Sequence, residues 1–256
     1  MEFGTIERLE EQLDGGSMNR RNMLALLGAT GLTMLDRHSS ADSRKEEMIR
    51  KMFSCIATPQ QTEGPYFVDE HLHRADIRSD PLDGSIKEGL PLTLDMHVFS
   101  VGKAGCKPLP GAVVDIWHCD AQGIYSDVID SHFNTVGKKF LRGYQITDTN
   151  GGVRFITIYP GWYPGRTVHI HFKIRTDPKT LQTHEFTSQL YFDDSITDRV
   201  HEQSAYAKKN PESFRTRNEE DGIFRKGGDQ LILKLARTDQ GYAGTFDVGL
   251  EMGYGK

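Results

Sequence analysis

The sequence has 256 residues, of which 37% are hydrophobic, and its 26 glycines bring the apolar share to that of a globular protein rather than a disordered chain. The formal net charge of -5, without a dense block of lysine and arginine, argues against nucleic acid or an anionic membrane as the main partner and favours a small molecule. The cysteines, Cys55, Cys106 and Cys119, contain no Cys-x-x-Cys pair, so we expect small buried residues rather than a disulfide framework or a thiolate zinc site.

The chain divides by composition into a tag, a short N-terminal segment and one domain. Residues 1–17 have the pattern of an artificial tag, a helical stretch that ends in a Gly-Gly-Ser linker. Residues 18–43 read as an export signal or an N-terminal helix, and 44–256 are expected to form a single domain.

The segment that starts at Met18 carries the features of a twin-arginine signal. Arg20 and Arg21 precede an apolar run over 23–35, and small residues follow at the positions that a signal peptidase needs. The run is too short to cross a bilayer as a mature helix, so no membrane span is expected in the mature form. These features predict a periplasmic or extracellular protein; a docking helix over 5–35 and a cytoplasmic location are the alternatives.

The remaining chain predicts an all-β fold, an antiparallel β-sandwich with a few short helices and long loops. A charged helical turn at 44–50 and a coil at 58–67 come first, and only 198–209 has a clear helical pattern. Between them, alternating or β-branched apolar runs recur with glycine and proline turns, which favours a sandwich over an α/β fold. The expected strands are 92–98, 112–117, 153–158, 168–174, 186–192, 231–235 and 246–250.

Two histidines, His169 and His171, lie two residues apart in the strand expected over 168–174. Alternation places the apolar residues on the core face and the histidines, with Lys173, on the other face. Residues on the same face of a strand are about 6.5–7 Å apart, so two imidazoles can bind one metal ion. The pattern indicates a metal clamp, with a half-exposed pair on a solvated face as the alternative.

Two tyrosines are candidates to complete such a site. No cysteine is clustered nearby and no His-Glu-x-x-His motif occurs, which leaves a thiolate or zinc-protease site unsupported. A cupin-like site would need a glutamate soon after the histidines, but Arg175 stands there and Glu185 is distant. Tyr163 lies in a Pro-Gly-rich turn and Tyr125 in a glycine-containing loop after a buried strand. Singly, each is typical of a surface aromatic; together they suggest ligands.

Five segments then follow one another along the chain: TEGPYF, PLPGAVVDIWHCDAQGIYSD, FLRGYQITDTNGGVRFITIYPGWYPGR, HIHFKI and SQLYFDD. In content and order they resemble the intradiol ring-cleavage dioxygenases, nonheme Fe(III) enzymes that open catechols between their two hydroxyls. The resemblance spans roughly Thr58 to Phe224. It implies that 44–256 is one catalytic domain with one ferric iron per chain, a catechol-type substrate, O2 as co-substrate and a cis,cis-muconate-type product.

The resemblance also implies roles for particular residues. By position, Tyr125, Tyr163, His169 and His171 correspond to the iron ligands of the family. Ferric iron is a hard cation that favours anionic oxygen, and its charge allows tyrosinate to form at neutral pH. The family pattern has the axial tyrosinate, here Tyr163, leave the metal and take a substrate proton.

Four further residues fall around this ligand set. Arg166 corresponds to the family arginine beside the bound ring, where a fixed cation stabilises developing negative charge, with a salt-bridging loop arginine as the alternative. Gln189 corresponds to a glutamine that holds a ligand or the substrate. Trp162 and Ile124 are expected as pocket walls or as packing residues.

Several other polar residues are expected to have no catalytic role. We expect His118 to be a satisfied core residue, and Asp127 and Asp130 to lie in a solvated loop rather than form an acid–base pair.

The sequence departs from the family in ways that leave the catechol open. Only residues 164–168 separate the second tyrosine from the histidines, as in the single-domain, often exported branch. We expect no long helical N-terminal domain of the kind found in catechol 1,2-dioxygenases. No partner subunit is visible, and a homodimer is compatible with the sequence.

Two rival functions fit part of the pattern. A transthyretin-like β-sandwich that only binds other molecules would share the strands but leave the tyrosines and histidines coincidental. An Fe(II) oxygenase with two histidines and one carboxylate would use Glu185 as its third ligand.

Overall fold

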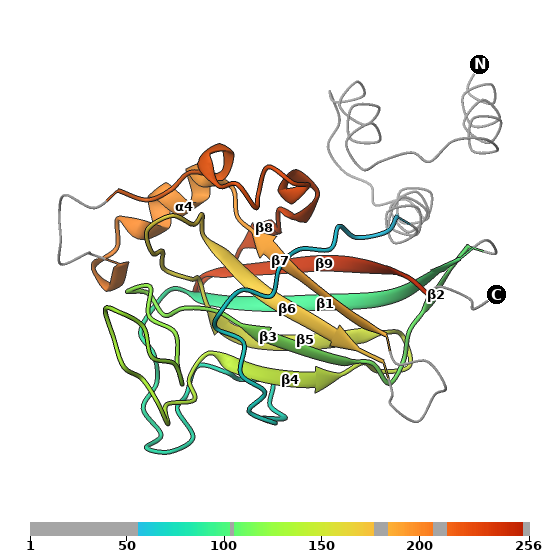
Figure 1. Ribbon diagram of the computed structural model, residues 1–256, viewed down its shortest axis with the longest axis horizontal. Coiled ribbons are helices and arrows are strands. Elements are labelled where there is room, and N and C mark those ends of the chain that lie inside the picture. Colours follow the sequence, from blue (N-terminus) through green and yellow to red (C-terminus); the bar gives the residue numbers. More distant parts are fainter. Residues whose placement is uncertain (1–55, 103–104, 177–183, 207–213, 253–256) are drawn as a thin grey trace. The chain divides into compact units, whose positions relative to one another are not determined.

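The computed structural model describes residues 56–102, 105–176, 184–206 and 214–252 (Figure 1). Apart from Ile56, these residues belong to one compact unit, Ala57–Lys256. The expected tag, the export signal and the helical turn at 44–50 lie outside the described residues.

The first of two sheets is built around a long strand whose alternation is visible in the sequence. In β1 (Pro91–Gly102), every second residue from Leu92 to Val98 is buried, and the intervening residues are half-buried. The order is β2-β1-β9-β8, and β5 also pairs with β1. The pairing of β1 with β9 is parallel, and the others are antiparallel. The other strands of this sheet are β2 (Gly105–Pro108), β5 (Gly152–Ile158), β8 (Lys234–Arg237) and β9 (Tyr242–Glu251).

The second sheet carries the histidines and is antiparallel throughout, in the order β4-β3-β6-β7. The apolar residues of its central strand, Ile170, Phe172 and Ile174, pack in the same hydrophobic cluster as Leu92 and Leu94 of β1. Figure 1 shows the two sheets as stacked layers, so the expected all-β sandwich is confirmed, with one parallel pair. The strands are β3 (Val113–Trp117), β4 (Arg142–Ile146), β6 (His169–Arg175) and β7 (Glu185–Tyr191).

The expected helix over 198–209 was wrong in its bounds, because the helix starts earlier. In the structure α4 spans Asp194–His201, and the Asp193 side chain caps it by accepting from the backbone N–H groups of Ser195 and Ile196. The chain then continues as a 3-10 turn, η1 (Ser204–Tyr206). Two further 3-10 turns are η2 (Asn218–Glu220) and η3 (Gly228–Leu231).

The expected strand over 231–235 was also wrong in its bounds, because residues 231–233 cross between the sheets and β8 starts only at Lys234. Leu233 N donates to Tyr191 O of β7 at 2.8 Å, and Ile232 forms an isolated bridge to the same tyrosine. Only from Lys234 does the chain pair with β9 in the other sheet.

The expectation for the cysteines was wrong at one position. Cys106, in β2, is disulfide-bonded, whereas Cys119 is a buried thiol whose Sγ contacts Gly161 O at 3.5 Å.

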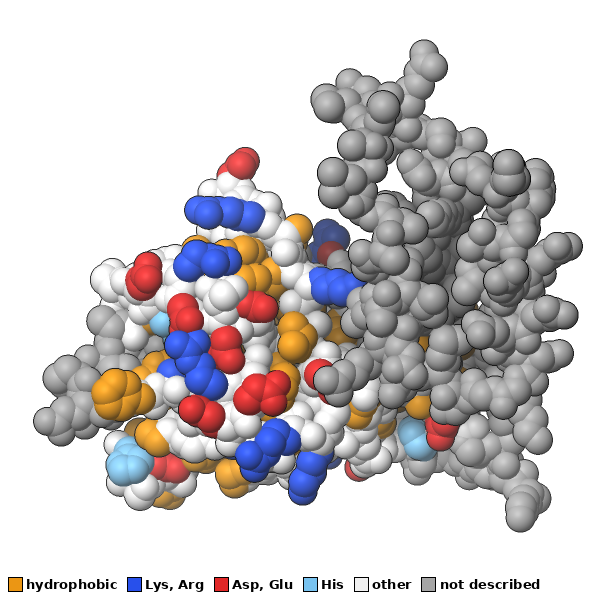
Figure 2. All heavy atoms as spheres, turned by 90° about the horizontal axis from the view of Figure 1, so that it is seen from above, with side chains coloured by type: hydrophobic (Ala, Val, Ile, Leu, Met, Phe, Trp, Pro, Cys, Tyr) orange, Lys and Arg blue, Asp and Glu red, His pale blue; other side chains and the backbone are white. Residues whose placement is uncertain are grey.

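The surface carries charges of both signs. On the face shown in Figure 2, acidic and basic side chains lie interspersed over the described residues. Among those residues, no helix has both the length and the apolar character needed to cross a bilayer.

Candidate metal centre

The two histidines of β6 lie buried at the start of the strand, and their Nε2 atoms face each other. His169 is 2% exposed, His171 is 1% exposed, and their Nε2 atoms are 3.0 Å apart. The Trp117 ring stacks on the His171 ring at 4.9 Å between centroids. A Cβ atom on Gly64 would lie 3.3 Å from His171 Cε1, so the TEGPYF segment also covers this ring. This burial excludes a half-exposed pair on a solvated face.

The two candidate tyrosines converge on the same point. Tyr125 Oη lies 3.4 Å and Tyr163 Oη 3.3 Å from His169 Nε2, and the two phenol rings meet edge to face at 5.8 Å. Tyr125 is 1% exposed and Tyr163 is half-buried. The structure therefore brings together the four side chains that the sequence singles out, from three separate segments.

Two loops hold the tyrosines in place. After β3, the Asp120 carboxylate accepts from the backbone N–H groups of Gln122 and Ile124, which fixes the turn that leads to Tyr125. The second loop runs against the first at Gly161, where a Cβ atom would lie only 2.4 Å from Ala121 O. Only glycine permits this close approach, which brings Tyr163 next to Tyr125.

The local hydrogen bonds fix one histidine in the form that binds a metal. His169 Nδ1 is 2.6 Å from Thr167 O; since a carbonyl only accepts, Nδ1 carries the proton and the Nε2 lone pair points at the other donors. Burial, and then the charge of Arg166, lower the pKa of His169 to about 3. Burial, and then His169, lower the pKa of His171 well below its ordinary value. Both rings are therefore neutral at physiological pH.

The phenols need a cation to become ligands. Burial is the main cause that raises the pKa of both Tyr125 and Tyr163, so each keeps its proton in the protein alone. Two neutral imidazole nitrogens and two phenol oxygens form a donor set suited to a hard, highly charged ion. Among the described residues, no group of three or more His, Cys, Asp or Glu side chains could hold a metal, so the phenol oxygens are needed to complete this site.

Arg166 and Gln189, both singled out from the sequence, contact each other beside the four donors. Arg166 Nη2 donates to Gln189 Oε1 at 2.5 Å. Gln189 pairs with His171 across the β6–β7 ladder, and its Nε2 donates to Thr62 O at 2.9 Å. The Arg166 guanidinium also pairs with Asp221, a residue that the sequence alone did not indicate.

The other predicted residues have structural surroundings of their own. Trp162 is buried in the main hydrophobic cluster, which is a packing role, and Ile124 is half-buried in the loop before Tyr125. His118 is fully buried, with Nδ1 at 2.8 Å from Cys119 O and Nε2 at 2.7 Å from Thr157 Oγ1, which confirms a satisfied core histidine.

One aromatic residue of the site was missed. Tyr66 stacks on Tyr125 with centroids 4.5 Å apart, and its ring meets the ring of Tyr163 at 6.1 Å. Its hydroxyl donates to Asp130 Oδ2 at 2.7 Å, and Asp130 lies in a loop that is open to solvent, as expected. The available signal was the aromatic pair in TEGPYF, a turn-rich segment with little other reason to carry such residues.

The structure rules out Glu185 as a metal ligand. Glu185 pairs with Arg175 at the opposite end of the ladder from His171 and Gln189, four residues away, which is about 13 Å along a strand. Its side chain is 64% exposed and lies near Lys173. The rival site with two histidines and Glu185 is therefore wrong.

Comparisons with known proteins agree with the geometry. A family model described as Dioxygenase matches residues 62–220. The catechol 1,2-dioxygenase of Acinetobacter baylyi is 34% identical over 145 residues, 47% of this chain and 43% of that protein. The protocatechuate 3,4-dioxygenase beta chain of Burkholderia cepacia is 35% identical over 126 residues, 44% of this chain and 52% of that protein. The chain thus spans about half the length of the curated relatives it matches.

A solved structure gives a fuller match. The intradiol ring-cleavage dioxygenase of Tetranychus urticae is 32% identical, with a TM-score of 0.65, and the match covers 77% of this chain and 95% of that one. The family match spans more than half of the sequence, and this structural match spans nearly all of the other protein. The chain belongs to the intradiol ring-cleavage dioxygenase family.

Proposed function

We propose that the protein is a nonheme Fe(III) dioxygenase that cleaves a catechol-type ring between its two hydroxyls with O2, giving a cis,cis-muconate-type product. The observation that carries the proposal is the convergence of four donor atoms. The second imidazole nitrogen, His171 Nε2, and the two phenol oxygens lie 3.0–3.4 Å from His169 Nε2. The names of the relatives, catechol 1,2-dioxygenase and protocatechuate 3,4-dioxygenase, support a catecholic substrate.

In this proposal Tyr125, Tyr163, His169 and His171 hold one iron per chain. When bound, ferric iron supplies the positive charge that stabilises the phenolates and the deprotonated catechol and activates that catechol toward O2. The two histidines are already neutral and directed at the site, so they bind without losing a proton.

The tyrosines differ in a way that suggests how the protons of the substrate are handled. Tyr125 is fully buried and stacked on by Tyr66, whereas Tyr163 is half-buried and lies on a Pro-Gly-rich loop. Tyr163 therefore has the freedom and the access to accept a proton from an entering catechol hydroxyl, and Tyr125 stays in place.

Arg166 provides a fixed positive charge for the substrate. Burial alone would lower its pKa, but the neighbouring Tyr163 and Asp221 raise it, so the guanidinium remains a cation. In a water-poor site, a preorganised cation of this kind stabilises negative charge that develops on the ring during cleavage.

The test is to purify the protein with iron and combine metal analysis, visible absorption and product identification. We expect iron in a tyrosinate-coloured protein, and ring-opened diacids from at least one of catechol, protocatechuate, hydroxyquinol, and alkyl- or chlorocatechols. Incorporation of both atoms of 18O2 identifies a dioxygenase. A colourless protein without turnover would instead favour the binding-module alternative.

We also propose that the protein is exported. The twin arginine at 20–21, with the apolar run after it, supports this proposal, and so does the disulfide at Cys106, because disulfides persist mainly in oxidising compartments. Replacing Arg20 and Arg21 together with lysine is expected to retain the protein in the bacterial cytoplasm, measured by fractionation. Unchanged export of the variant would contradict the signal.

A further inference from the structure

The arginine of the site is held by an acidic residue from a distant part of the chain. Arg166 Nε donates to Asp221 Oδ2 at 2.9 Å, while Nη2 is occupied by Gln189. The side chains of Arg166 and Asp221 are 16% and 1% exposed. An ion pair this deeply buried is costly to break, because the remaining charge would have no partner.

The Asp221 carboxylate is fully used by hydrogen-bond donors. Its Oδ2 also accepts from Thr167 N at 2.9 Å, and its Oδ1 accepts from Ile223 N at 2.7 Å and Phe224 N at 3.3 Å. Burial alone would raise the pKa of Asp221, but the Thr167 N–H and the charge of Arg166 lower it below the ordinary value. The group is therefore ionised at neutral pH and fixed in orientation.

The same carboxylate contacts Thr167, which stands two residues before the metal-ligand candidate His169. Thr167, whose N–H it accepts, is also the residue whose carbonyl contacts His169 Nδ1 at 2.6 Å. Thr167 Oγ1 further donates to Asn218 Oδ1 at 2.6 Å. The segment around 218–221 thus supports the backbone on which both Arg166 and His169 stand.

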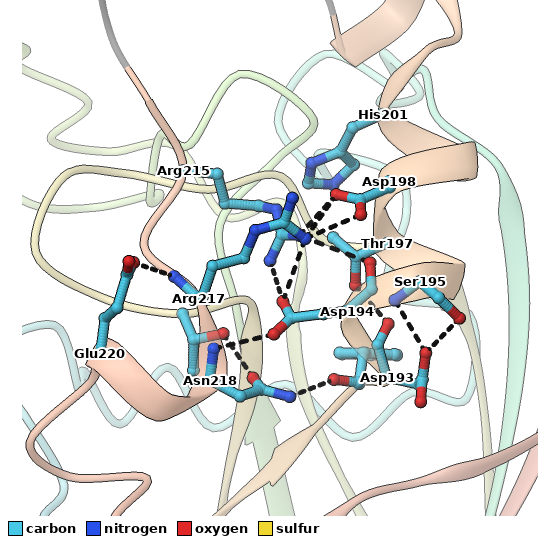
Figure 3. A network of polar contacts seen from close by, with 12 residues as sticks. Asp193, Asp194, Ser195, Thr197, Asp198, His201, Arg215, Arg217, Asn218 and Glu220 are labelled. Carbon is cyan, nitrogen blue, oxygen red and sulfur yellow. Dashed lines mark hydrogen bonds and ion pairs between the residues drawn. The ribbon is translucent and has the colours of Figure 1, made fainter.

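A surface network fixes this segment in turn, as Figure 3 shows. Arg215 contacts Asp194 and Asp198 of α4, and Arg217 donates to both oxygens of Asp198 at 2.8 and 2.7 Å. Asn218 N donates to Asp194 Oδ2 at 3.0 Å. The chain that leads to Asp221 is therefore anchored on α4.

We propose that Asp221 is a positioning residue for catalysis, which holds the Arg166 guanidinium in the orientation that faces the bound ring. The proposal rests on the proposed catechol cleavage. Gln189 alone contacts one end of the guanidinium and leaves the Nε end unsupported. Asp221 supplies the second contact, so the cation is in place before substrate binds and no reorganisation is needed during reaction.

Asp221→Asn is a sharp test, because all four partners of the carboxylate are N–H donors. Whichever way the amide is turned, its NH2 group faces a donor, so one side loses its hydrogen bonds as well as the charge. We expect kcat per bound iron to fall by about tenfold, equivalent to about 1.4 kcal/mol, with KM little changed. Iron content and tyrosinate absorption should remain, since no ligand is altered.

The matched control is Asp95→Asn. Asp95 holds Arg154 through two hydrogen bonds, at 2.6 and 3.0 Å, but that arginine is 67% exposed and lies on the first sheet. Its kcat should equal that of the wild type. In an Arg166→Ala background, Asp221→Asn should cause no further loss, because the group it positions is gone. A full tenfold loss in that background would overturn the proposal.

A second measurement does not depend on turnover. Labelling of Arg166 by phenylglyoxal, mapped by mass spectrometry, should be faster by roughly threefold or more in Asp221→Asn, because a guanidinium without its partner is more mobile and more reactive. Labelling of Arg166 should be unchanged in Asp95→Asn. Equal labelling in wild type and Asp221→Asn would overturn the positioning role. Because labelling needs no turnover, this result is distinct from a failure of the proposed function, in which the wild type cleaves no catechol.

Asp221→Glu covers the case in which the asparagine variant does not fold. It keeps the charge and displaces the carboxylate by one methylene, so we expect faster labelling of Arg166 and a smaller loss of kcat than for the asparagine variant. Wild-type values for both readouts would contradict the proposal.

Discussion

Tyr125→Phe and His171→Ala are each expected to remove iron binding or reduce turnover by about a thousandfold or more, a loss of about 4 kcal/mol or more in transition-state stabilisation. Each change deletes one of the four donor atoms that converge beside His169, and a buried phenyl or methyl group cannot replace it. Iron per chain, the visible absorption band and kcat on the best catechol substrate measure the effect.

Tyr242→Phe is the matched control for the tyrosine change. Tyr242 begins β9 on the other sheet, so loss of its hydroxyl should leave iron content and turnover unchanged. Full turnover with full iron in Tyr125→Phe would show that this phenol is not a ligand, and the same result in His171→Ala would remove that histidine from the site.

Arg166→Ala is expected to keep the iron and lose rate. The change removes the fixed cation but none of the four converging donors, so absorption of the iron protein should persist while kcat falls by about a hundredfold, equivalent to about 2.7 kcal/mol. Steady-state kinetics normalised to iron content give the result.

Arg154→Ala provides the comparison, since it removes an arginine from an exposed ion pair outside the site. It should be kinetically silent. If Arg166→Ala keeps wild-type kcat, the guanidinium does not stabilise the reacting substrate, and the role proposed for Asp221 falls with it.

The sequence predicted the strands best where one face of a strand is buried and local alternation reports it. The run from Leu92 to Val98 alternates cleanly and lies in β1. By contrast, β4 has the sequence RGYQI, in which glycine and glutamine hide any period of two, and this strand was not predicted. The start of α4 depends on a single capping aspartate after β7, which shifted the helix to residues earlier than its apolar pattern suggested.

For the site, the sequence was informative where the chemistry is concentrated in short motifs. His169 and His171 stand in one strand, and the family pattern places Tyr125 and Tyr163 with them. Asp221 carries no such signal, since its partner Arg166 is 55 residues away and only the folded chain brings the two together. The contact of Tyr66 with Asp130 was likewise hidden from the sequence, because the two residues are 64 positions apart.

Because β1 pairs with β9, which comes last in the described chain, the first sheet can be completed only late in synthesis. β1 ends at Gly102, but its β9 edge stays open until Tyr242–Glu251 has left the ribosome. Until then a nascent chain presents an unpaired strand edge, which other chains can join. Synthesis that stops before β9 should therefore yield aggregates rather than a smaller stable domain.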